Sequence, residues 1–380
     1  MEKNRNNTKF LLLIANQIIS KKLFFRMKKK PFKKQYLRKS KFLLLIFFLI
    51  IEIRLYIRIK FIDKEKKEEE QKELKLWNEK YKQQLYYHNN QINVEDPYKT
   101  NQGYHPKVIS FEKPWNGYKY WMAFTPYPYR KSNRENPCIN VSNDLKNWKC
   151  PQGLINPLST PLPGYYNYNS DSHLLYNEET NQLEVFWRWV SHSKVVVFTR
   201  ASSDGINWSP KKEFLRTENR YKIDYLSPSI IRENGKYRIW FVSSGNRIYY
   251  MEKNDKMKTT PRFINITFHN NLRTWHLDVI HNKKKNIYEL LVVAYSSSKY
   301  LHYMPLFYSF SKDNKKWSFP VVILEKSKNP KNFDARGLYK SSVLYLNNTY
   351  YLFYSGHTKG SRVGIGLVYG KNIKYLRPYM

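Results

Sequence analysis

Three carboxylates stand where their side chains could act in catalysis: Asp171, Asp278 and Glu135. Asp171 lies in the polar run 169–173, where a β-strand is expected to begin, and Asp278 lies in the segment 275–280, at another expected strand start. A carboxyl group can serve as a general acid or a general base, depending on how its surroundings set its pKa. The alternative role of Asp278 is an inward residue bonded to a neighbouring sheet, and that of Glu135 is a loop cap. We therefore treat all three as candidate catalytic residues.

Polar and aromatic residues near the same expected strand starts could bind a substrate. Trp275 could stack on the face of a sugar ring, although core packing is the alternative for any single aromatic residue. Arg336 could equally pair with the nearby Asp334. No set of residues has the spacing of a zinc site, and no nucleotide, phosphate-loop or serine-nucleophile motif occurs, so we predict neither a metal nor a cofactor. The candidate substrate-binding residues are His105, Trp275, His276, Arg336 and Tyr339.

A turn motif repeats along the chain. The pattern Ser-x-Asp-x-x-x-Trp occurs three times, ending at Trp148, Trp208 and Trp317, and a degenerate copy stands at 252–256. In such a turn the Asp carboxylate accepts backbone N–H groups and the Trp packs on the sheet. The spacing between the copies is typical of propeller blades or of a solenoid.

Five strand starts, near residues 105, 170, 227, 275 and 339, are each followed by a turn and an aromatic-rich strand. A strand, a turn, a second strand and a Ser-Asp hairpin together form the pattern of a four-stranded propeller blade. The sequence therefore predicts an all-β fold, a five-bladed β-propeller over residues 99–380. The innermost strands of a propeller line its central funnel, so the candidate residues should converge on one pocket.

This pattern resembles the five-bladed propellers of glycoside hydrolase families 43 and 32. The Ser-Asp turns are also similar to the Asp boxes of six-bladed sialidases, but five blade starts favour five blades. The resemblance implies an Asp base, a second Asp and a Glu acid at the first three blade starts. Asp171 matches the second Asp, whereas His105 replaces the first and the start at Ser227 offers no Glu. Two readings stay open: a diverged hydrolase that uses Asp171 with Asp278 or Glu135, or a noncatalytic carbohydrate-binding propeller.

The N-terminal part combines basic, apolar and charged segments. Residues 42–51 are wholly apolar and follow a basic stretch, which predicts a basic cytoplasmic tail at 1–41 and a transmembrane signal anchor at 42–60. A cleaved signal peptide is the alternative. Mixed Lys and Glu residues predict a charged helical spacer at 61–98. The positive-inside rule then places the propeller outside a single-pass cell membrane, where a cell-surface or extracellular polysaccharide would be its partner.

The net charge of +37 does not indicate a nucleic-acid partner. Residues 1–60 alone carry 17 Lys or Arg against Glu2 and Glu52, so much of the excess lies in the N-terminal segment. Cys138 and Cys150 could form one small disulfide loop or remain free thiols. We therefore expect a carbohydrate-active propeller with no nucleic-acid partner.

Overall fold

The computed structural model divides the chain into two compact units, the first ending at Lys72 and the second running from Glu73 to Met380. The structure describes residues 34–161, 166–268, 272–296 and 304–380.

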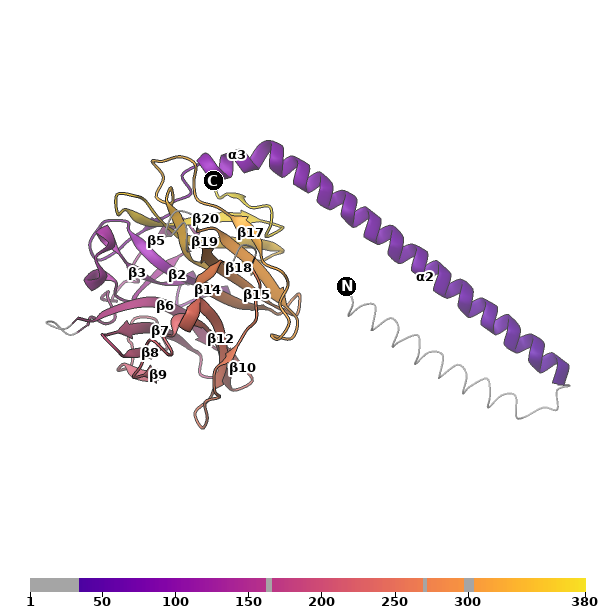
Figure 1. Ribbon diagram of the computed structural model, residues 1–380, viewed down its shortest axis with the longest axis horizontal. Helices are drawn as coiled ribbons and strands as arrows, with labels where there is room; N and C mark the ends of the chain where they lie inside the picture. The colour runs from indigo at the N-terminus through magenta and orange to yellow at the C-terminus, as the bar shows by residue number, and fades with distance from the viewer. Residues whose placement is uncertain (1–33, 162–165, 269–271, 297–303) are drawn as a thin grey trace. The chain divides into compact units, whose positions relative to one another are not determined.

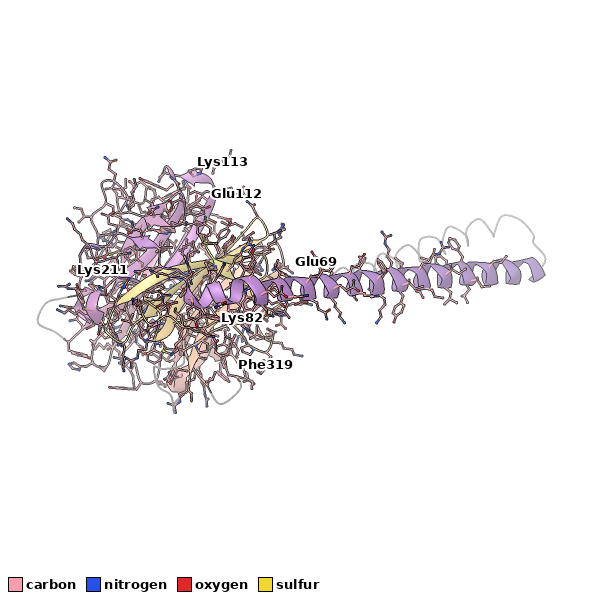
Figure 2. The ribbon with its side chains drawn as sticks, turned by 90° about the horizontal axis from the view of Figure 1, so that it is seen from above. Glu69, Lys82, Glu112, Lys113, Lys211 and Phe319 are labelled. Carbon is pink, nitrogen blue, oxygen red and sulfur yellow. The ribbon has the colours of Figure 1, made fainter. Side chains whose placement is uncertain are left out.

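One continuous helix, α2 (Lys34–Leu76), contains the apolar run and most of the charged segment after it (Figure 1). Its described side chains are mostly exposed along the whole length, Glu69 among them (Figure 2). Charged residues, beginning with Glu52 and Arg54, follow the apolar run at once, and a charge at the centre of a bilayer is costly. Among the residues that the structure describes, no helix is both long and apolar enough to cross a membrane. The transmembrane anchor expected at 42–60 is therefore not supported.

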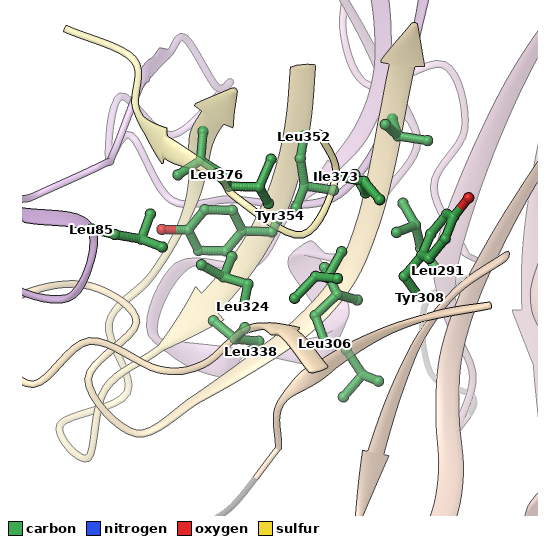
Figure 3. Close-up of a cluster of buried hydrophobic side chains, with 14 of the residues drawn as sticks. Leu85, Leu291, Leu306, Tyr308, Leu324, Leu338, Leu352, Tyr354, Ile373 and Leu376 are labelled. Carbon is green, nitrogen blue, oxygen red and sulfur yellow. The ribbon is translucent and has the colours of Figure 1, made fainter. Parts of the chain in front are cut away.

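The propeller unit begins before residue 99, because the end of the expected spacer packs into its core. A π-helical turn, η1 (Trp77–Tyr81), leads into α3 (Lys82–Tyr87). Trp77 donates its indole N–H to the carbonyl oxygen of Leu376 at 2.6 Å, and Leu85 is buried in a cluster with Leu376 and Tyr354 (Figure 3). The segment from residue 73 therefore belongs to the propeller unit rather than to a solvated spacer.

Five antiparallel sheets, each built from consecutive strands, confirm the five-bladed β-propeller (Figure 1). The first consists of β2 (Gly103–Trp115), β3 (Tyr118–Pro126) and β4 (Cys138–Ser142), and the second of β6 (Tyr168–Asn177), β7 (Gln182–Val190), β8 (Val195–Ser202) and β9 (Lys212–Thr217). The third consists of β10 (Leu226–Glu233), β11 (Lys236–Ser243), β12 (Arg247–Lys253) and β13 (Arg262–Phe263). The fourth consists of β14 (Arg273–Asn282), β15 (Ile287–Tyr295), β16 (Leu306–Ser311) and β17 (Val321–Leu324), and the fifth of β18 (Gly337–Leu346), β19 (Thr349–His357), β20 (Val363–Gly370) and β21 (Arg377–Pro378).

The segment before the first blade joins the last blade to the first. The N–H of Ile92 donates to the carbonyl oxygen of Ile365 in β20 at 2.9 Å, and the N–H of Leu367 donates to the carbonyl oxygen of Asn90 at 3.0 Å. The chain then continues as β1 (Asn93–Val94), which pairs in parallel with β5 (Asn147–Trp148) beside the first blade. Residues 90–94 thus close the ring of blades by backbone hydrogen bonds.

The predicted turn motifs share one hydrogen-bonding pattern. Each Asp carboxylate accepts the backbone N–H groups two and three residues further on, as Asp313 does from Lys315 at 2.8 Å and Lys316 at 2.9 Å. These donors hold the pKa of the Asp313 carboxyl at about 2. The degenerate copy keeps the pattern through the side chain of Asn254. Cys138 and Cys150, on either side of the first turn, are free thiols.

Candidate active site

A cavity of about 430 Å³ lies where the innermost strands of the blades begin. Most of the residues singled out from the sequence line it: His105, Glu135, Asp171, Trp275, His276 and Tyr339. Asp278 and Arg336 are not among the lining residues.

β-Bulges near the starts of the innermost strands turn these side chains toward the cavity. Strands β2, β6, β10, β14 and β18 each shift register within their first residues, for example between Tyr104 and Lys107 and between Ser170 and His173. At the first two bulges, His105 and Asp171 have φ of 50° and 52°, in the left-handed region that side chains seldom adopt. Bulges re-aim side chains beside functional sites, and left-handed residues other than Gly cluster there.

His105, Asp171 and His276 bring three potential metal-ligand atoms within 4.8 Å of one another. Oδ1 of Asp171 lies 3.7 Å from Nε2 of His105 and 3.1 Å from Nδ1 of His276. All three residues are buried, yet none of these three atoms makes a hydrogen bond. Buried polar atoms are nearly always hydrogen-bonded, so three that converge without partners indicate a site for a ligand.

The pKa shifts of Asp171 and His276 suit a cation. Burial alone would raise the pKa of the Asp171 carboxyl, but His105, His276 and Lys340 outweigh it and hold that pKa well below its usual range. Burial lowers the pKa of His276, against the opposing effect of Asp171. An ionised carboxylate and neutral imidazoles are the forms that coordinate metals.

Glu135 contacts His105 at Nδ1, whereas Asp171 lies near Nε2, the other nitrogen of the ring. Oε1 of Glu135 is 3.1 Å from Nδ1 of His105, and Oγ1 of Thr125 is 2.9 Å from the same nitrogen. When the Glu135 carboxylate accepts the ring proton at Nδ1, the lone pair of Nε2 faces Asp171 and His276. Burial raises the pKa of the Glu135 carboxyl although His105 opposes this, so the pKa values of Glu135 and Asp171 are shifted in opposite directions.

These residues fit a divalent ion by donor type and by spacing. Two ligand atoms that each lie about 2.1 Å from one ion are roughly 3 to 4 Å apart. The distances from Asp171 to the two imidazoles fall within or near that range. Imidazole and carboxylate donors suit transition metals such as Zn²⁺ and Mn²⁺. The sequence predicted that His105, Asp171 and His276 converge on one pocket, but it predicted no metal, because residues so far apart along the chain have no recognisable metal-ligand spacing.

Aromatic rings shape one side of the cavity. Tyr339 lies over His276 with 4.0 Å between ring centroids, and it stacks on Tyr104 at 4.7 Å and 29°. The ring of Trp275 meets that of Tyr339 edge-on. Tyr339 therefore restricts how the His276 ring can rotate and offers an apolar surface to a bound sugar.

Arg188 and Asp224 also line the cavity, and sequence reasoning missed both. Nη1 of Arg188 lies 3.9 Å from Oδ2 of Asp171, while its Nε donates to the backbone oxygen of Asp224 at 2.9 Å. The Arg188 guanidinium also forms an ion pair with the Asp224 carboxylate. A charged residue within the aromatic run of β7 was the signal that could have identified Arg188, whereas Asp224 stands in a loop with no recognisable pattern.

The structure places Asp278 in a buried network instead of the cavity. Nζ of Lys107 lies 2.7 and 2.8 Å from its two carboxylate oxygens, and the Ser229 hydroxyl donates to Oδ1 at 3.0 Å. Its carboxylate therefore links β14 to β2 and β10, which is the alternative role considered for it.

Arg336 likewise lies away from the predicted pocket. It lines a separate cavity together with Lys326 and Lys359, and its N–H donates to the carbonyl oxygen of His357 at 3.0 Å. The loop before β18 leads it there, so Arg336 and Tyr339, three residues apart, lie in different cavities.

Fold and site together define a five-bladed β-propeller with a buried His-Asp-His cluster in its central cavity. No family model matches the chain. It is 38% identical over 108 residues to the A type blood N-acetyl-α-D-galactosamine deacetylase of Flavonifractor plautii, a match that spans 27% of this chain and 14% of the length of that enzyme.

Solved structures share the whole propeller. An N-acetylgalactosamine deacetylase from F. plautii, in complex with blood group B trisaccharide, has a TM-score of 0.65 at 22% identity, over 76% of this chain and 94% of that one. A thermostable family-43 glycoside hydrolase has a TM-score of 0.52 at 14% identity, over 73% and 93%. The expected resemblance to family 43 is thus confirmed at the level of the fold.

Proposed function

We propose that this chain is a carbohydrate hydrolase that removes the acetyl group from an N-acetylated sugar at the cluster of His105, Asp171 and His276. The observation that carries this proposal is the convergence of three buried ligand atoms that have no hydrogen-bond partner. The partial match to a sugar deacetylase supports the choice of reaction. In this reaction water adds to the amide carbonyl carbon, the C–N bond breaks, and acetate and a free amine leave.

The residues of the cavity have distinct roles in this proposal. His105, Asp171 and His276 would hold a divalent ion, which polarises a carbonyl group and lowers the pKa of a water molecule. Glu135 orients the His105 ring through Nδ1. Arg188, buried beside Asp171, keeps that carboxylate in place and anionic. Tyr339 provides an apolar wall for the sugar.

Cleavage of a glycosidic bond is the second candidate. It is favoured by the opposite pKa shifts of Glu135 and Asp171 in one cavity, since glycosidases need one protonated and one ionised carboxyl group. Against it, the two carboxylates contact the two nitrogens of the same His105 ring, instead of standing free on opposite sides of a substrate. We therefore rank it below deacetylation.

The products distinguish the two reactions. The purified chain would be incubated with the blood group A trisaccharide, and released acetate and reducing sugar would be measured with and without EDTA. We expect acetate, its loss in EDTA, and its recovery when Zn²⁺ or Mn²⁺ is restored. Asp171→Asn should abolish release, whereas Asp255→Asn, a matched change on an exposed turn, should not.

Other outcomes identify the alternatives. Reducing sugar released regardless of EDTA would identify a glycosidase, and binding without either product would identify a noncatalytic carbohydrate-binding propeller. Action on a cell-surface or extracellular polysaccharide stays a prediction, and localisation of a tagged chain would test it.

A further inference from the structure

The cavity has a buried floor and an exposed mouth. His105, Asp171 and His276 are almost completely buried, so they form the floor. The lining residues that are exposed, within the described part of the chain, are Ser132, Tyr166 and Gly245. Tyr166 is the only one of these with an aromatic ring, and its side chain is 69% exposed.

The ring of Tyr166 is held in place from one side. It stacks on His192 with 5.0 Å between centroids and 24° between planes, which leaves its other face open to solvent. An aromatic ring that is held flat and exposed at a cavity mouth is suited to the C–H face of a sugar ring, because both bury apolar area on contact.

The parts of the chain that carry these two rings are fixed by hydrogen bonds. Trp189 donates its indole N–H to Oδ1 of Asn167, next to Tyr166, at 3.1 Å. His192 lies in the turn between β7 and β8, where the N–H of Ser191 donates to the carbonyl oxygen of Lys194 at 3.0 Å. In the same turn, the carbonyl oxygen of Ser193 accepts the N–H of Arg220 at 2.7 Å. The stacked pair is therefore a preformed surface.

We propose that Tyr166, supported by His192, is an outer subsite that binds the second sugar residue of a glycan whose terminal residue lies at the cavity floor. This inference rests on the proposed function and extends it: the substrate is an oligosaccharide or polysaccharide rather than a free monosaccharide. Tyr166 would contribute to substrate affinity and to selection by chain length, without contacting the reacting atoms.

Two substrates and three variants test the subsite. KM and kcat for acetate release would be measured with methyl N-acetyl-α-D-galactosaminide and with the blood group A trisaccharide. Tyr166→Ala should raise KM for the trisaccharide about 2- to 12-fold more than KM for the methyl glycoside, as expected for the loss of one ring contact. Tyr166→Phe keeps the ring and should keep the wild-type ratio. Tyr221→Ala removes a tyrosine that is 80% exposed but does not line the cavity, and serves as the matched control.

The results separate this inference from the proposed function. If Tyr166→Ala changes KM for both substrates equally, or for neither, the outer subsite is wrong while deacetylation stands. If the wild-type chain releases no acetate, titration calorimetry would compare the affinities of the wild-type chain and the Tyr166 variants for the methyl glycoside and the trisaccharide. That comparison tests the outer subsite independently of deacetylation. Weaker trisaccharide binding in Tyr166→Ala but not in Tyr166→Phe would then support it, and no preference for the longer glycan would overturn it.

Discussion

Nζ of Lys107 lies 2.7 Å from one carboxylate oxygen of Asp278 and 2.8 Å from the other, and both side chains are buried. The pair joins β2 of the first blade to β14 of the fourth across the centre of the ring. Removal of one partner leaves a buried charge without its counterion.

Lys107→Met should therefore lower the free energy of unfolding by about 3 to 5 kcal/mol. Lys113→Met, an exposed change on the same strand, should alter it by less than about 0.5 kcal/mol. Denaturation with urea measures both. Equal stability of the two variants would show that Asp278 is satisfied without Lys107.

Glu135→Gln should weaken the binding of Zn²⁺ or Mn²⁺ about 10- to 100-fold, because it removes the carboxylate that orients the His105 ring through Nδ1. Calorimetric titration with each metal measures the affinity. Glu112→Gln, an exposed change on β2, is the control and should bind as the wild-type chain does. Unchanged affinity in Glu135→Gln would contradict the orienting role.

Asp334 should make stability depend on pH between about 4 and 6. Burial raises the pKa of its carboxyl to about 6, although the hydroxyl of Tyr354 donates to it at 3.0 Å. Because the folded chain keeps this proton to a higher pH than the unfolded chain does, its contribution is complete below about pH 4 and is lost as pH rises through about 6.

The free energy of unfolding should fall by on the order of 3 kcal/mol as the pH rises from about 4 to about 6. Asp334→Asn should abolish this dependence on pH. Unfolding by urea at pH 4, 5, 6 and 7 would compare the two chains. Parallel pH profiles for the wild type and Asp334→Asn would show that this carboxyl has an ordinary pKa when folded.

Gly205→Ala should destabilise the propeller more than Gly235→Ala. Both glycines have positive φ, 75° and 70°, so an added Cβ strains the backbone at each. At Gly205 the Cβ would also overlap the ring of Trp121, whereas at Gly235 nothing lies within 4 Å. Thermal unfolding should show that Gly205→Ala lowers the free energy of unfolding by roughly 1 to 3 kcal/mol more than Gly235→Ala does. Equal costs would mean that Trp121 moves aside freely.

The repeated turns and strand starts were visible in the sequence because each blade uses the same local pattern. Residues such as Asp171 and His276 could be assigned to one pocket for that reason. The bulges could not be predicted, since a register shift depends on the partner strand and not on the residue itself. For the same reason the pairing of Asp278 with Lys107, 171 residues away along the chain, left no trace in local sequence.

The closure of the ring by residues 90–94 has a consequence for synthesis on the ribosome. Asn90 and Ile92 are made early, but their partners in β20 are made almost last. Until then residues 90–92 lack their partners in β20, and the innermost strand β2 of the first blade lacks its neighbours β18 and β19. Pairings that are so distant along the chain form slowly. The first blade should therefore remain open to chaperones and proteases until translation is nearly complete.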